Sequence, residues 1–142
     1  MELKIKSFDS LTVCELYEIL KARCAVFIVE QNCPYQDIDD VDHNAVHIWL
    51  EEKGNIKAYL RVFDRDETCA QLGRVITTER GKGFGGQVLR EGLKACRDIL
   101  RKDKIYIEAQ CYATGFYEKE GFAAFGEEFL EDGIPHICMM RE

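Results

Sequence analysis

Apolar residues near the start of the chain recur with the period of a helix. Between residues 12 and 28 they share one helical face, and Thr12 and Glu15 have the spacing of a capping box at its start. The positions on this face are Val13, Leu16, Tyr17, Leu20, Cys24 and Phe27. Residues 2–6 favour a short strand ahead of it. This part of the chain therefore predicts a strand followed by one long helix.

The pattern then changes to strict alternation. A polar loop containing Pro34 comes first, and residues 45–52, 56–63 and 69–77 then alternate apolar with polar side chains, as half-buried strands do. Short polar turns separate the three segments. We therefore expect an antiparallel meander.

Helical spacing returns after a group of glycines. Residues 84–101 carry one apolar face, made of Val88, Leu89, Leu93, Cys96 and Leu100. The elements that follow are a strand, a short helix closed by Gly121 and a hairpin around an Asp-Gly turn, at residues 104–110, 113–122, 123–129 and 135–140. This order of elements indicates a mixed α+β fold in a single domain, residues 1–142.

The amino-acid composition argues against several classes of binding partner. The formal net charge of −7 opposes nucleic-acid binding, which needs clustered cations, and leaves a cationic partner open. No apolar run approaches the roughly 20 residues that span a bilayer, so we expect a cytoplasmic protein that does not enter the membrane. The seven cysteines include no CxxC pair, which favours free buried thiols over a disulfide framework or a thiolate zinc site.

Two near matches to metal motifs fail. The run HNAVH, residues 43–47, has Asn44 where the zinc motif HExxH has its glutamate. The run DIDDVDHN, residues 37–44, has Val41 at the fifth position of a calcium loop and no glycine at the sixth. We therefore expect no bound metal.

A glycine-rich turn joins the last alternating segment to the helix that follows. The first N–H groups of a helix have no internal partner and the helix dipole is positive there, so this arrangement is typical of an anion site. Arg80 and Lys82 add positive charge. The alternative to an anion site is that the glycines only form a tight turn. Against this alternative, each glycine in a first helical turn destabilises the helix by about 1 kcal/mol relative to alanine. We expect a phosphate or pyrophosphate ligand on Gly81, Gly83, Gly85 and Gly86.

The run GKGFGG also satisfies the dinucleotide pattern GxGxxG. Glu108 lies at about the distance at which that fold places its ribose carboxylate. An NAD(P)-binding oxidoreductase is therefore one alternative. The preceding meander opposes it, because a Rossmann domain is built from successive βαβ units. The P-loop pattern is absent.

Residues 80–85 also fit the pattern [QR]xxGx[GA], and GFYEKEGF follows at residues 115–122 with a Tyr-xxx-Gly-Phe arrangement. In these features the chain resembles the GNAT family of N-acetyltransferases. The runs RCAVFIVEQNCPYQDID, residues 23–39, and EDGIPHICM, residues 131–139, resemble its ElaA-like subfamily. The resemblance extends from the first helix to the last strand.

This resemblance implies the GNAT fold, in which helices flank a mixed, mostly antiparallel sheet with splayed middle strands. It also implies acetyl-CoA as co-substrate, with its pantetheine arm inserted between strands 69–77 and 104–110. Main-chain groups there would polarise the thioester carbonyl. The residues expected to bind the donor are Val75, Ile76, Thr77, Arg80, Gly81, Lys82, Gly83, Phe84, Gly85 and Gly86.

The reaction implied is direct attack of a neutral amine on the thioester. Tyr117 matches the position of the general acid that protonates the leaving thiolate, with packing in the core as the alternative. Some relatives carry a glutamate base on the strand before the loop, but residues 69–71 contain no carboxylate. Glu108, His47, His136 or an ordered water remain as bases.

The polar loop lies beside the acceptor cleft in the family. Its carboxylates would attract an ammonium substrate, or would simply be solvated. We assign the acceptor cleft to Glu30, Asp37, His47 and His136, and expect a primary amine of a small molecule or protein as acceptor. A non-catalytic acyl-CoA-binding module is the alternative to an enzyme, and a homodimer would be ordinary for the family.

Overall fold

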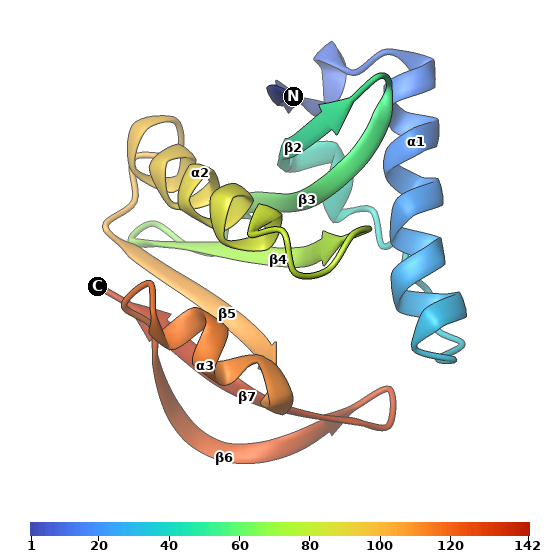
Figure 1. Ribbon diagram of the computed structural model, residues 1–142. Helices are drawn as coiled ribbons and strands as arrows, with labels where there is room; N and C mark the ends of the chain where they lie inside the picture. The colour runs from blue at the N-terminus through green and yellow to red at the C-terminus, as the bar shows by residue number, and fades with distance from the viewer.

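Seven strands form one mixed sheet in the computed structural model, which describes residues 1–142 (Figure 1). Their order is β1-β2-β3-β4-β5-β7-β6, and only β4 and β5 are parallel neighbours. The bounds are β1 Glu2–Ser7, β2 Val46–Glu52, β3 Asn55–Asp64, β4 Cys69–Thr77, β5 Lys104–Gln110, β6 Ala123–Glu131 and β7 Ile134–Arg141. The predicted α+β fold is confirmed. One parallel pair is not the repeated βαβ arrangement that the dinucleotide alternative requires.

Helices cover both faces of the sheet (Figure 1). The first, α1 (Val13–Arg23), begins with the predicted capping box, in which Glu15 N–H donates to Thr12 Oγ1 at 3.0 Å and Thr12 N–H donates to Glu15 Oε1 at 2.9 Å. A π-helical segment, Cys24–Glu30, extends the helical run slightly beyond its predicted end. On the other face lie α2 and α3, Phe84–Asp98 and Thr114–Glu118, so α2 ends before residue 101. No helix is both long enough and apolar enough to cross a bilayer.

Alternation along β3 explains why two cores form. Leu60 and Val62 face α2 and belong to a cluster of 17 buried residues, whereas Tyr59 belongs to a cluster of 7 beneath α1. Gly92 lets α2 approach the sheet closely, because a Cβ built there would lie 2.9 Å from Leu60 Cδ1. The middle of the sheet is thus held between two packed layers.

A bulge interrupts β4. In its pairing with β3, Ile76 lies opposite Tyr59 but Gly73 lies opposite Arg61, so β4 has one more residue than β3 between these pairs. Arg74, in the bulge, has a φ of 55°, in the left-handed region that few non-glycine residues adopt. The bulge redirects the second half of the strand.

The same part of β4 separates from its other neighbour. β4 and β5 pair only through residues 69–71 and 104–106, and Figure 1 shows the two strands diverging beyond this point. The expected splay of the middle strands is therefore confirmed. It leaves one edge of residues 72–77 without a neighbouring strand.

Candidate active site

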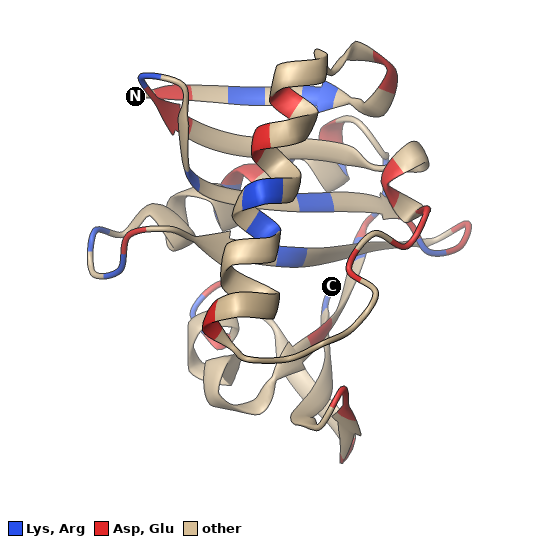
Figure 2. Ribbon diagram, turned by 90° about the vertical axis from the view of Figure 1, so that its right-hand side faces the viewer, with Lys and Arg blue, Asp and Glu red and all other residues tan.

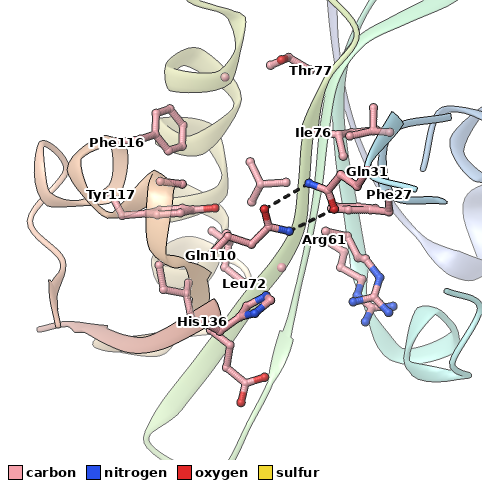
Figure 3. A pocket seen from close by; sticks show the side chains of 18 of the residues that line it. Phe27, Gln31, Arg61, Leu72, Ile76, Thr77, Gln110, Phe116, Tyr117 and His136 are labelled. Carbon is pink, nitrogen blue, oxygen red and sulfur yellow. Dashed lines mark hydrogen bonds between the residues drawn. The ribbon is translucent and has the colours of Figure 1, made fainter. Parts of the chain in front are cut away.

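A cavity of about 950 Å³ opens where β4 and β5 separate (Figure 3). Its walls come from β4, the glycine loop, α3, the end of β5, the β6–β7 turn and the chain that follows α1. The predicted residues Tyr117, Glu108 and His136 line it together. The predicted donor-binding residues that line it are Val75, Ile76, Thr77, Arg80, Gly81, Gly83, Phe84, Gly85 and Gly86. Lys82 is not among the lining residues.

The glycine loop leaves the start of α2 open. Gly81 and Gly83 have φ angles of 77° and 76°, which a residue with a Cβ adopts only with strain. Gly83 is the N-cap of α2 and has no side chain with which to cap it. The N–H groups of Phe84, Gly85 and Gly86 donate to no protein acceptor. These free donors next to the cavity are the features of an anion site.

Arg80 is held at the edge of this loop. Its guanidinium donates to Thr77 Oγ1 at 2.9 Å and to Glu30 Oε1 at 2.8 Å. Glu30 therefore pairs with the loop and does not line the cavity, contrary to its predicted place in the acceptor cleft. Lys82 pairs instead with Glu79, at 3.6 Å.

Tyr117 projects from α3 towards the cavity (Figure 3). Its ring packs edge-on against Phe116 and Phe122, with centroid distances of 5.0 and 5.9 Å. The hydroxyl makes no hydrogen bond to the protein, and burial raises its pKa above the ordinary value of 10.0. The phenol thus stays protonated at neutral pH and keeps its proton available to a ligand. This geometry is compatible with both predictions for Tyr117, namely packing of its ring in the core and donation of its proton to a leaving thiolate.

Glu108 reaches the cavity from β5. Tyr106 lies on the same face of that strand, and its hydroxyl donates to Glu108 Oε2 at 2.9 Å. No lysine or arginine forms an ion pair with the Glu108 carboxylate. The side chain is therefore positioned by a neutral donor and keeps its negative charge uncompensated.

His136 lies on β7, the strand paired with β5, and lines the cavity beside Glu108. Its Nδ1 donates to the Ile134 carbonyl at 2.7 Å, which leaves Nε2 as the basic nitrogen of the neutral ring. That Nε2 lies 3.5 Å from Glu131 Oε2. Glu131 also lines the cavity. It lies in β6 after a bulge that shifts the register of the strand, so alternation in the sequence did not predict which way it faces.

Two predicted cleft residues lie elsewhere. His47 is fully buried; its ring nitrogens contact Tyr59 Oη at 2.7 Å and the Asp42 carbonyl at 3.0 Å, and burial lowers its pKa. Asp37 is also buried, bound by Arg23. Neither lines the cavity. The assignment of His47 and Asp37 to the acceptor cleft is corrected to a structural role for both.

The acidic loop binds arginines of the protein itself. Figure 2 shows basic segments on α1 and on strands behind it, beside the acidic chain that follows α1. Arg23, completely buried, donates to Asp37 Oδ2 at 3.0 Å and to Asp42 Oδ1 at 2.7 Å. Arg61 and Arg74 complete the network with ion pairs to Asp39, at 2.6 and 3.2 Å. Arg61 and Arg74 lie far along the chain from these aspartates, so the alternation that predicted strands β3 and β4 did not indicate the ion pairs.

Lowering the pH is expected to reduce the free energy of unfolding through protonation of Asp39. Burial raises its pKa, but the hydrogen bonds and charges of Arg61 and Arg74 outweigh burial and hold the pKa at about 2, below 3.8. A carboxyl with a depressed pKa stabilises the fold above the unfolded-state pKa and loses that contribution as pH falls towards the folded-state value. We expect about 1–2 kcal/mol to be lost between about pH 4 and pH 2.

Urea unfolding at several pH values measures this effect. Asp39→Asn should reduce the free energy of unfolding at pH 7 and flatten its dependence on acid, whereas Asp40→Asn, on an exposed neighbour without an ion pair, should do neither. Equal acid dependence in the wild type and Asp39→Asn would contradict the account.

A pair of glutamine side chains spans the cavity. Gln31 Nε2 donates to Gln110 Oε1 at 3.1 Å, and Gln110 Nε2 donates to Gln31 Oε1 at 3.2 Å. Figure 3 shows the pair between Tyr117 and His136. The cavity therefore has a half beside the glycine loop and Tyr117, and a half beside His136. Neither glutamine was predicted as a site residue, because the two come from segments far apart in the chain, the end of the first helical run and the end of β5.

A sheet whose middle strands part in front of a glycine-lined helix start is the architecture of the GNAT acyltransferases. The family model for the acetyltransferase (GNAT) domain matches residues 15–142, and the chain belongs to this family.

Its relatives place it in the ElaA-like subfamily. Protein ElaA of Escherichia coli (strain K12) is 41% identical over 140 residues, covering 94% of this chain and 92% of that protein. The crystal structure of Escherichia coli ElaA has a TM-score of 0.94 at 38% identity and covers 100% of both chains. An acyl-CoA N-acyltransferase from Pseudomonas aeruginosa has a TM-score of 0.93 at 36% identity, again over 100% of both chains.

The fold is shared more widely. An aminoglycoside 6'-N-acetyltransferase, solved with coenzyme A, has a TM-score of 0.75 at 13% identity, covering 97% of this chain and 96% of that one. Family and structural neighbours together support acyl-CoA N-acyltransferase activity for the protein.

Proposed function

We propose that the protein transfers an acetyl group from acetyl-CoA to a primary amine of a small molecule or protein. The observation that carries the proposal is the start of α2, where three N–H groups without protein partners adjoin the gap between β4 and β5. A diphosphate needs several donors in one place, and an extended arm needs a free strand edge. Both are present within one cavity.

The donor would bind along this path. Its diphosphate would accept hydrogen bonds from Phe84, Gly85 and Gly86, where a Cβ on Gly85 would already crowd Thr77 Cγ2 at 3.2 Å. The pantetheine arm would lie along the free edge of residues 75–77. Main-chain N–H groups of that edge would polarise the thioester carbonyl.

The reaction needs two proton transfers. The amine nitrogen forms the new C–N bond while the C–S bond breaks, so the nitrogen must lose a proton and the departing sulfur gains one. Tyr117 is suited to protonate the sulfur, since its hydroxyl is free and its raised pKa keeps it protonated. The half of the cavity beside His136 is the acceptor half, where the amine would bind. Glu108 and His136 both line the cavity there, and either could take the proton from the amine.

Ligand binding gives the first test. Coenzyme A or acetyl-CoA at a hundredfold excess over Kd should stabilise the fold by about 2.7 kcal/mol, which raises the Tm by about 5–10 °C. NAD should give no shift. Gly83→Ala places a Cβ at the helix start and should weaken coenzyme A binding about tenfold.

Gly126→Ala is the matched control. Gly126 has the same φ of 76° as Gly83 and equally open surroundings, but it lies on β6 and outside the cavity. Both variants should lose similar stability, and only Gly83→Ala should lose coenzyme A affinity. Equal binding by the two variants would contradict the proposed donor site.

Free-thiol release then separates an enzyme from a non-catalytic acyl-CoA-binding module. An enzyme releases coenzyme A from acetyl-CoA faster when an acceptor amine is added. A protein that binds acetyl-CoA but shows no amine-dependent release with small amines or lysine peptides would be the binding module.

A further inference from the structure

The acceptor half of the cavity has a charge distribution that the acidic loop does not explain. Of the four aspartates in the loop, Asp40 is exposed, forms no ion pair and lies outside the cavity. The other three are each paired with arginine: Asp37 and Asp42 with Arg23, and Asp39 with Arg61. The third arginine of the network, Arg74, pairs with Asp37 at 2.8 Å. Three positive and three negative groups thus compensate one another. The network presents no excess charge to a ligand.

The uncompensated charge belongs to the opposite wall. Glu108 on β5 and Glu131 at the end of β6 both line the cavity, and neither forms an ion pair with lysine or arginine. The two lie close enough to repel each other: burial, followed by the charge of Glu108, raises the pKa of Glu131, and Asp132 acts in the same direction, whereas His136 and Arg74 lower it. A cation between these carboxylates would relieve the repulsion.

His136 adds an independent feature on the same wall. The side chain is only 9% exposed, yet it lines the cavity, and its Nε2 forms no hydrogen bond. With Nδ1 donating to the Ile134 carbonyl, Nε2 of the neutral ring is an acceptor that no protein donor uses, 3.5 Å from Glu131 Oε2. An ammonium group, which has three N–H donors and no acceptor, satisfies two carboxylates and an imidazole nitrogen at once.

We propose that the acceptor carries a second cationic group, and that Glu108, Glu131 and His136 hold this group while the other amine reaches the acyl carbon. The proposal rests on the proposed acetyl transfer and specifies its acceptor class as a linear aliphatic diamine. In this role Glu108 and His136 bind the acceptor and take no proton, so the attacking amine loses its proton to solvent water while Tyr117 protonates the departing sulfur. The attacking amine would lie on the Tyr117 side of the glutamine pair; Figure 3 shows the positions of these three side chains.

Matched acceptors test the proposal. Four- and five-carbon linear diamines are compared with the monoamines of the same length and with the corresponding amino carboxylates, by thiol release from acetyl-CoA. We expect kcat/KM about tenfold higher for each diamine than for its monoamine, because two partly exposed carboxylates act together. The amino carboxylates should be the poorest acceptors, because their second charge is repelled. Equal kcat/KM for diamine and monoamine would overturn the proposal.

Charge-removing variants locate the effect. Glu131→Gln should raise the KM for diamines several-fold and leave kcat, the KM for acetyl-CoA and monoamine turnover unchanged. Glu108→Gln should also raise the KM for diamines several-fold, and the KM for monoamines much less. Glu127→Gln removes the same charge from β6 outside the cavity and should alter none of these values. A loss of kcat with every acceptor in Glu108→Gln would show Glu108 to be the base, and would overturn its binding role.

Measuring the binding of the acceptor gives a test that does not depend on turnover. Calorimetric titration of the coenzyme A-loaded protein with diamine and with monoamine should show tighter binding of the diamine, lost in Glu131→Gln. Absence of that preference overturns the proposal even where acetyl-CoA turnover is intact. Failure of coenzyme A to bind, in contrast, overturns the proposed function itself.

Discussion

Replacing Arg23 with methionine is expected to lower the free energy of unfolding by about 3–5 kcal/mol. The Arg23 side chain is completely buried, and it donates to the side chains of Asp37 and Asp42 and to the Asp37 carbonyl, the last at 2.9 Å. Methionine fills much of the volume but leaves two buried carboxylates with fewer partners. Removing one member of a buried ionic network costs far more than the network contributes as a whole, because the remaining charges stay desolvated.

Lys21→Met is the matched control for this prediction. Lys21 lies on the same helix, is 60% exposed and pairs with Glu18 at 2.8 Å across one turn. Such an exposed pair contributes little to stability, because solvent screens it. Urea unfolding at pH 7 measures both variants. If Arg23→Met is no less stable than Lys21→Met, the buried network does not hold the acidic loop, and the loop is positioned by packing alone.

The periodic parts of the fold were predictable from the sequence. Strand 104–110 and the capping box of Thr12 and Glu15 are local features, fixed by alternation and by hydrogen bonds between near neighbours. The π-helical segment Cys24–Glu30 was not predictable, because its apolar residues continue the helical pattern and period alone does not report the hydrogen-bond spacing. The bulge at Arg74 was missed for a similar reason, since it interrupts a strand whose side chains still alternate.

The candidate site also has a part that was predictable from the sequence and a part that was not. The glycine loop was predictable because Gly81 and Gly83 signal a backbone conformation that depends on the residues themselves. Of the acceptor residues, Glu108 and His136 were predicted and line the cavity, whereas Glu131 was missed, because whether a carboxylate is compensated depends on partners far along the chain. The loop carboxylates are compensated by Arg61 and Arg74 from two strands, whereas Glu131 faces the cavity without such a partner.

Tyr117→Phe is expected to lower kcat for acetyl transfer about a hundredfold, the lower end of what general acid catalysis contributes. The hydroxyl makes no hydrogen bond to the protein, and the ring is held by edge contacts with Phe116 and Phe122 that phenylalanine preserves. Stability and the KM for acetyl-CoA should therefore change little. Because burial raises the Tyr117 pKa above 10.0, ionisation of this phenol should cause no loss of wild-type activity below about pH 10.

Steady-state kinetics of Tyr117→Phe beside Tyr17→Phe, an exposed tyrosine of α1, separates a chemical role from a packing role. A packing role predicts lower stability and a changed KM with kcat preserved, because the lost hydroxyl would matter only through the position of the ring. A role as the acid predicts the reverse, and the deficit should shrink with an acyl donor whose thiol leaving group is more acidic, since that group departs without a proton. Full turnover by Tyr117→Phe with every acceptor would exclude the acid role and leave main-chain polarisation of the carbonyl as the principal source of catalysis.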